Sequence, residues 1–184
     1  MKIIFIRHGK TKGNLEKRYI GRTDEPLCSK GISEISQRKY PHADIVVSSP
    51  MKRCLQSAEI IYPEKEIFIC PELRETDFGD FEGKNYSQLA EDIRYRRWID
   101  GEYSSPPNGE SREDFIERCC TGFSETVNKL MGKTSAFIVH GGTIMAIMSR
   151  FAYPEGSFYD FQVKNGGGYT AELSDGKIIN YTEF

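Results

Sequence analysis

The first eleven residues of the chain, M-K-I-I-F-I-R-H-G-K-T, restrict the fold more than any other stretch. Residues 3–6 form a short apolar run without polar alternation, which is typical of a strand buried on both faces. The run ends at Arg7, His8 and Gly9, and residues in this position lie where open α/β sheets bind their ligands. Alone, the triplet is weak and favours a surface arginine beside a satisfied histidine. With support from other strand ends, it predicts an anion site that contains a nucleophile.

The rest of the chain alternates between strand and helix patterns. Short apolar runs predict further buried strands at 43–47, 67–70 and 135–139, and a closing hairpin of 169–173 and 177–181 around Asp175-Gly176. Helices are expected over 51–62 and 86–100, after the N-cap Ser29 and after His140. The longest helix is expected to begin at Ser111 and to carry an apolar stripe that ends at Leu130. The segment 10–26 is expected to be a loop. This alternation predicts an α/β three-layer sandwich: a mostly parallel central sheet with helices on both faces.

Three of the predicted strands end in residues that suit a phosphate group. They lead into Arg7-His8, into Arg53 through Ser49-Pro50, and into His140-Gly141. If these strands are neighbours, two guanidinium groups, which match phosphate oxygens bidentately, lie beside two imidazoles, which are nucleophilic when neutral. His8 and His140 could instead bind zinc, but no cysteine or carboxylate ligands stand at short spacing. We therefore expect no metal and no other cofactor.

Composition narrows the range of functions. The 184 residues predict a single domain, 1–184, and 25 Lys and Arg against 27 Asp and Glu argue against nucleic acid or an anionic membrane as partner. No apolar stretch approaches the length of a membrane span. Five cysteines without a C-x-x-C pair favour reduced thiols and a cytoplasmic protein. Nothing in the sequence indicates an oligomeric state.

Taken together, the motifs resemble those of the histidine phosphatase superfamily, the phosphoglycerate-mutase-like fold. The matching stretches, in the family's order, are 7–11 (R-H-G-K-T), Asn14, 48–58 (S-S-P-M-K-R-C-L-Q-S-A), 73–75 (L-R-E), 78–83 (F-G-D-F-E-G) and His140-Gly141. The resemblance implies a phosphatase domain in which His8 attacks phosphorus to give a phosphohistidine intermediate, with Glu75 as the general acid and base. It also implies that Arg7, Asn14, Arg53, His140 and the backbone amide of Gly141 hold the phosphate oxygens.

Several other polar residues have alternative interpretations. Glu82 is a rival acid, but its place in the 78–83 motif favours a role in structure or substrate positioning. His42 has no motif around it and is expected at the surface. Lys10 replaces a glutamate common in the family and could tune the charge at the entrance. Arg94, Arg96, Arg97 and Trp98 are interpreted as a solvated helix face rather than as part of the substrate rim.

Within the superfamily, the chain is most similar to the α-ribazole phosphatases, on the evidence of 78–83, 106–111 (P-P-N-G-E-S) and 158–166. This resemblance implies a small-molecule phosphomonoester substrate, α-ribazole 5′-phosphate of cobalamin nucleotide-loop biosynthesis. A broad-specificity phosphatase or a phosphoglycerate mutase are the alternatives, followed by a non-catalytic binder. The mutase is disfavoured by Ile20, Phe78 and Tyr86, which stand where mutases have Thr or Ser, Tyr and Lys.

Overall fold

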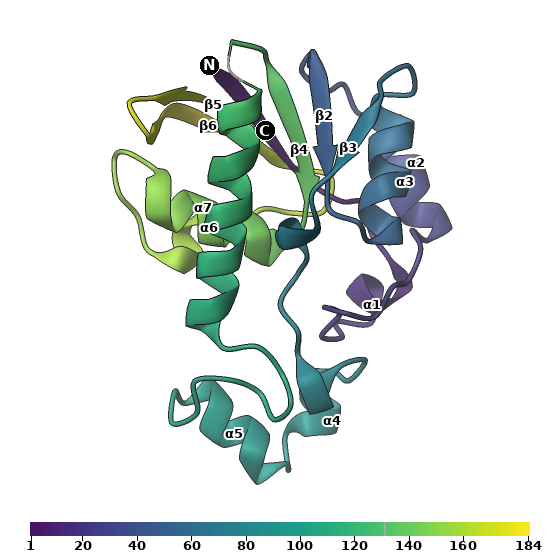
Figure 1. Ribbon diagram of the computed structural model, residues 1–184. Helices are drawn as coiled ribbons and strands as arrows, with labels where there is room; N and C mark the ends of the chain where they lie inside the picture. The colour runs from purple at the N-terminus through teal and green to yellow at the C-terminus, as the bar shows by residue number, and fades with distance from the viewer. Residues whose placement is uncertain (131) are drawn as a thin grey trace.

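The computed structural model describes residues 1–130 and 132–184, and its centre is a six-stranded sheet (Figure 1). The strands are β1 (Lys2–Arg7), β2 (Ile45–Ser48), β3 (Ile67–Ile69), β4 (Ser135–Val139), β5 (Gly168–Ser174) and β6 (Lys177–Glu183). Their order is β3-β2-β4-β1-β5-β6, in which β3, β2, β4 and β1 are parallel and β5 and β6 form an antiparallel hairpin. The predicted mostly parallel α/β sheet is confirmed.

Helices cover both faces of the sheet because its central strands are apolar on both sides. Successive side chains of a strand point to opposite faces. In β1, Ile3 and Phe5 belong to the core shared with α6 (Arg112–Lys129) and α7 (Gly141–Phe151), whereas Ile4 and Ile6 pack toward α3 (Lys52–Ile61). Figure 1 shows α6 and α7 on one side of the sheet, with α2 (Ser29–Ser36) and α3 on the other.

Two of the expected elements differ from the structure. The segment 10–26 is not wholly a loop, because a one-turn helix, α1 (Lys12–Leu15), begins after Thr11. Thr11 and Asn14 form a reciprocal capping box that satisfies two backbone N–H groups of the turn. The helix expected over 86–100 is two helices, α4 (Tyr86–Leu89) and α5 (Ile93–Ile99), since the Asp92 side chain caps the second one by accepting from the N–H of Arg94.

Several predicted helix ends are also displaced by one residue: the helix expected over 51–62 is α3, Lys52–Ile61. Cys28, not Ser29, is the N-cap of α2, and its sulfur accepts a hydrogen bond from the N–H of Gly31. Leu130 follows the last residue of α6 as its C-cap. These shifts leave the core unchanged, since the apolar stripe of α6 from Phe115 to Val127 is buried as expected.

The α4–α5 lobe (residues 78–103) lies beyond the sheet, at the bottom of Figure 1. It has a small core of its own, in which Phe81, Leu89 and Tyr95 are buried and Trp98 packs against them. The described residues also form 3-10 helices: η1 (Pro71–Leu73) precedes the lobe, η2 (Gly79–Phe81) lies at its start, and η3 (Phe158–Phe161) follows α7. Within the described ranges, no helix combines the length and apolar character needed to cross a lipid bilayer.

Candidate active site

The candidate site forms where three adjacent parallel strands end. β2, β4 and β1 are neighbours, with Arg7 paired to Val139 and Ser48 paired to Ile138. The residues that follow these strands therefore meet at one edge of the sheet, as the sequence predicts. The rings of His8 and His140 lie edge to face with their centroids 5.2 Å apart.

His8 is held in the form that a nucleophile requires. Its side chain is buried, and its Nδ1 lies 2.7 Å from the carbonyl oxygen of Gly9. Because a carbonyl can only accept, Nδ1 carries the proton and Nε2 keeps its lone pair. Burial, followed by the positive charges of Arg53 and Arg7, lowers the pKa of His8 well below its ordinary value. The lowered pKa favours the neutral ring, and a neutral ring with a free Nε2 is what the predicted role of His8 as nucleophile requires.

His140 is fully buried and held from two sides. Its Nδ1 accepts a hydrogen bond from Nε of Arg53 at 3.2 Å, so its Nε2 carries the proton and faces Oγ of Ser49 at 2.7 Å. Burial and the nearby charge of Arg53 lower the pKa of this histidine as well. The partnership with Ser49 was not anticipated, because residues 91 positions apart give no local signal. A phosphate contact from His140 remains a prediction.

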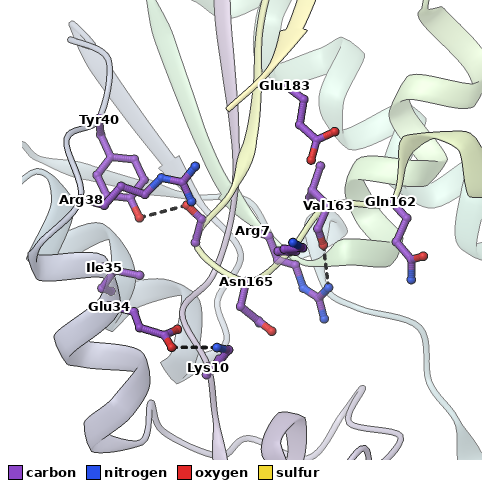
Figure 2. Close-up of a pocket in the computed structure, with 12 residues that line it drawn as sticks. Arg7, Lys10, Glu34, Ile35, Arg38, Tyr40, Gln162, Val163, Asn165 and Glu183 are labelled. Carbon is purple, nitrogen blue, oxygen red and sulfur yellow. Dashed lines mark hydrogen bonds and ion pairs between the residues drawn. The ribbon is translucent and has the colours of Figure 1, made fainter.

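The two arginines differ in how far the protein satisfies them. Arg53 is fully buried, and its Nη1 and Nη2 donate to the carbonyl oxygens of Thr23 and Gly21, each at 2.9 Å. Arg7 donates from Nη1 to the carbonyl of Val163 at 2.8 Å (Figure 2), but its buried Nε has no partner in the described part of the chain. Burial lowers the pKa of Arg7. A buried donor without an acceptor is rare, and this one marks Arg7 as a candidate contact for an anion.

Glu75 lies beside the N-terminus of α7. Its two carboxylate oxygens accept from the N–H groups of Thr76 at 3.0 Å and Gly142 at 3.1 Å. Burial raises the pKa of this carboxyl, which favours the protonated form that a general acid needs. The approach depends on glycine, since a Cβ at position 142 would collide with the Glu75 carboxylate. Gly141 similarly leaves room for Arg7, whose Cζ would lie 3.2 Å from a Cβ there.

Asn14 is connected to His8 through a third residue. Nδ2 of Asn165 lies 3.1 Å from both the carbonyl oxygen of His8 and Oδ1 of Asn14. Asn165 thus joins the segment before β5 to the two predicted site residues. In the sequence it stands out only as part of the 158–166 motif, which gives no indication of this bridging role.

The remaining polar candidates have other surroundings. Glu82 accepts hydrogen bonds from the loop at 21–23, as a structural residue would. His42 is exposed beside Asp44, as expected. Lys10 pairs with Glu34 at 2.8 Å on the edge of a cavity of about 660 Å³ between α2 and the segment 162–166 (Figure 2).

A larger cavity of about 930 Å³, the aromatic pocket, is bordered by Arg7, Glu75 and Gly142. Seven rings line it: Tyr19, Phe78, Trp98, Tyr103, Phe115, Phe158 and Tyr159. The guanidinium of Arg112 lies over the rings of Phe158 and Tyr159, 5.8 and 5.5 Å from their centroids. The solvated-face interpretation of 94–98 is therefore wrong for Trp98, although Arg94, Arg96 and Arg97 are exposed and ion-paired as expected.

The mostly parallel sheet and the cluster of histidines and arginines at its edge define a class of proteins. Comparisons with known proteins identify that class. Residues 3–180 match the histidine phosphatase superfamily (branch 1), and the chain belongs to this family. It is a phosphatase.

Its relatives include the uncharacterized phosphatase PhoE of Bacillus subtilis, which is 30% identical over 82% of this chain and 77% of its own length. The adenosylcobalamin/alpha-ribazole phosphatase of Salmonella typhimurium is 27% identical over 98% of this chain and 96% of its own. The crystal structure of a putative alpha-ribazole-5'-P phosphatase from Escherichia coli superposes with a TM-score of 0.86 at 22% identity, covering 100% of this chain and 94% of the other. That structure shows the likeness of fold.

Proposed function

We propose that the protein is a metal-independent phosphomonoester hydrolase that works through a phosphohistidine intermediate. Nε2 of His8 attacks phosphorus in line, and the bond from phosphorus to the ester oxygen breaks as the phosphorus–nitrogen bond forms. Glu75 gives its proton to the departing alkoxide. It then takes a proton from a water molecule, whose oxygen attacks phosphorus, so that phosphate leaves and His8 regains its lone pair.

The site supplies the charge that this reaction needs. In a loose phosphoryl-transfer transition state, negative charge is spread over the three non-bridging oxygens. Arg7 and Arg53, together with Asn14, His140 and the amide of Gly141, would hold these oxygens in place. The observation that carries the proposal is the buried Nε of Arg7, which has no hydrogen-bond partner among residues 1–130 and 132–184, next to His8 with its lowered pKa. Such preorganised donors stabilise developing charge without a metal ion.

For the substrate, we propose α-ribazole 5′-phosphate, the phosphate ester of a ribose that carries an aromatic base. The aromatic pocket begins at Glu75, where the leaving group must emerge, and Trp98 and Tyr159 are among the rings that line it. A planar base can stack on such rings, and a cavity of about 930 Å³ is within the range of small-molecule sites. The named activity of the Salmonella typhimurium relative agrees with this choice.

The proposal is tested by phosphate release from α-ribazole 5′-phosphate, 3-phosphoglycerate and 4-nitrophenyl phosphate, with a chelator present. We expect a preference for α-ribazole 5′-phosphate, loss of turnover in His8→Ala, and full turnover in the exposed control His42→Ala. Trp98→Ala should raise KM for α-ribazole 5′-phosphate about 5- to 100-fold, as for loss of a base-stacking ring, and leave KM for 3-phosphoglycerate unchanged. Equal turnover of all three substrates would refute the substrate, and turnover in His8→Ala would refute the mechanism.

A further inference from the structure

The charge of Arg53 has no direct counter-ion. Its side chain is fully buried, yet no carboxylate in residues 1–130 or 132–184 forms an ion pair with it. Backbone carbonyls of the loop 20–23 accept its Nη hydrogens instead. A buried charge is costly. Burial raises the pKa of the Glu75 carboxyl and the charge of Arg53 counteracts this rise, but the Nη hydrogen bonds of Arg53 are made to this loop.

The carboxylate of Glu82 lies on the other side of the same loop. Its Oε1 accepts from the N–H groups of Gly21 at 3.0 Å and Arg22 at 2.9 Å. Its Oε2 accepts from the Thr23 hydroxyl at 2.7 Å and from the Thr23 N–H at 3.3 Å. Glu82 therefore binds the amide edge of the loop, and Arg53 binds its carbonyl edge.

One peptide group makes both contacts. The peptide between Gly21 and Arg22 donates its N–H to Glu82 at 2.9 Å and accepts from Nη2 of Arg53 at 2.9 Å through its carbonyl. In a trans peptide the N–H and the C=O point in opposite directions. The positive end of this peptide dipole therefore faces the Glu82 carboxylate, and its negative end faces the Arg53 guanidinium. Hydrogen bonds in such a chain polarise and strengthen one another.

We infer that Glu82 is a positioning residue, which serves as the relayed counter-charge of Arg53 through the peptide groups of the loop 20–23. Arg53 in turn orients His140 through Nε. Gly21 is required for the relay, since a Cβ there would collide with the carbonyl of Thr76 and lie 2.6 Å from the Glu82 carboxylate. The inference rests on the proposed role of Arg53 in holding the phosphoryl group.

A double-mutant cycle with 4-nitrophenyl phosphate tests the relay. Glu82→Gln should lower kcat/KM about 10- to 100-fold, as loss of an outer partner does at other sites. The matched control is Asp80→Asn. Asp80 lies in η2, whose C-cap is Glu82, but its carboxylate accepts from Arg94 and Asn108 and not from the loop. The control variant should stay within about twofold of wild type. In an Arg53→Gln background, Glu82→Gln should have less than about a twofold further effect, because the residue that it positions is gone.

The outcomes separate the relay from the proposed site. If Glu82→Gln lowers activity equally with and without Arg53, Glu82 does not act through it and the inference is wrong. If Arg53→Gln alone keeps full activity, the proposed site is at fault. If the double variant does not fold, calorimetry measures the affinity of the single variants for inorganic phosphate instead. The affinity should fall in Glu82→Gln and not in Asp80→Asn. Equal affinity in the two variants would overturn the inference.

Discussion

Acidification is expected to destabilise the protein through its two buried histidines. Burial and the adjacent arginines hold the pKa values of His8 and His140 well below the ordinary value in the folded state. Both rings therefore stay neutral, whereas in the unfolded chain they take up protons near pH 6.5. Because the unfolded state binds more protons, the free energy of unfolding falls as the pH falls through this value.

The size of the effect follows from the unfolded chain. Between pH 7.5 and pH 5.5, protonation of one ordinary histidine stabilises the unfolded state by about 1.4 kcal/mol, and two give about 2.7 kcal/mol. Glu75 works in the opposite direction, since its pKa is raised and it gains a proton in the folded state on acidification. The exposed His42, whose side chain lies at the surface beside Asp44, serves as the control.

Urea unfolding at pH 7.5 and pH 5.5 measures the loss of stability. The Glu75→Gln background removes the opposing carboxyl, and there the loss should approach about 2.7 kcal/mol. Adding His8→Asn should reduce the loss to about half, whereas adding His42→Asn should leave it unchanged. If the stability of the Glu75→Gln protein is the same at the two pH values, or if His42 accounts for the loss, His8 is not a buried neutral group and the argument for its nucleophilicity fails.

Two further predictions concern Glu75 and its support. Glu75→Gln should slow hydrolysis of an alkyl phosphate about 10²- to 10⁴-fold. Hydrolysis of 4-nitrophenyl phosphate should slow far less, because its weakly basic leaving group needs no proton. Steady-state rates with the two esters measure the difference, and equal losses would contradict the role of Glu75 as acid. Gly142→Ala should push the Glu75 carboxylate aside and lower kcat about 10²-fold. Ser149→Ala, on the same helix, is the control and should leave kcat unchanged. If kcat of Gly142→Ala is also unchanged, the approach of Glu75 to α7 is dispensable.

The sequence was sufficient for most of the fold. Buried strands appear as short apolar runs, and 135–139 is observed with the predicted bounds. Because the carboxyl ends of parallel strands lie at one edge of a sheet, the sequence alone predicts that His8, Arg53 and His140 meet. Where side chains override periodicity the prediction failed, as at Asp92, whose cap divides the helix expected over 86–100.

The contacts that tune the site could not be predicted. Ser49 contacts His140, and Asn165 bridges His8 and Asn14. These residues lie far apart in the sequence, so no periodic sequence pattern indicates that they meet. Trp98 was misassigned because it shares a short helix with three charged residues, and only the packing of the α4–α5 lobe turns it toward the aromatic pocket. Such contacts depend on tertiary geometry, whereas motif spacing reflects only the order of elements along the chain.

The position of β1 between β4 and β5 has a consequence for synthesis of the protein. Ile3, at the start of the chain, pairs with Ser135 on one side and Ala171 on the other. β1, which immediately precedes His8, can therefore complete its pairing only after β4 and β5 have been synthesised. Pairing over such sequence distances is slow and leaves an apolar strand exposed meanwhile. A nascent chain halted before β5 would thus be inactive and would present an apolar strand to chaperones.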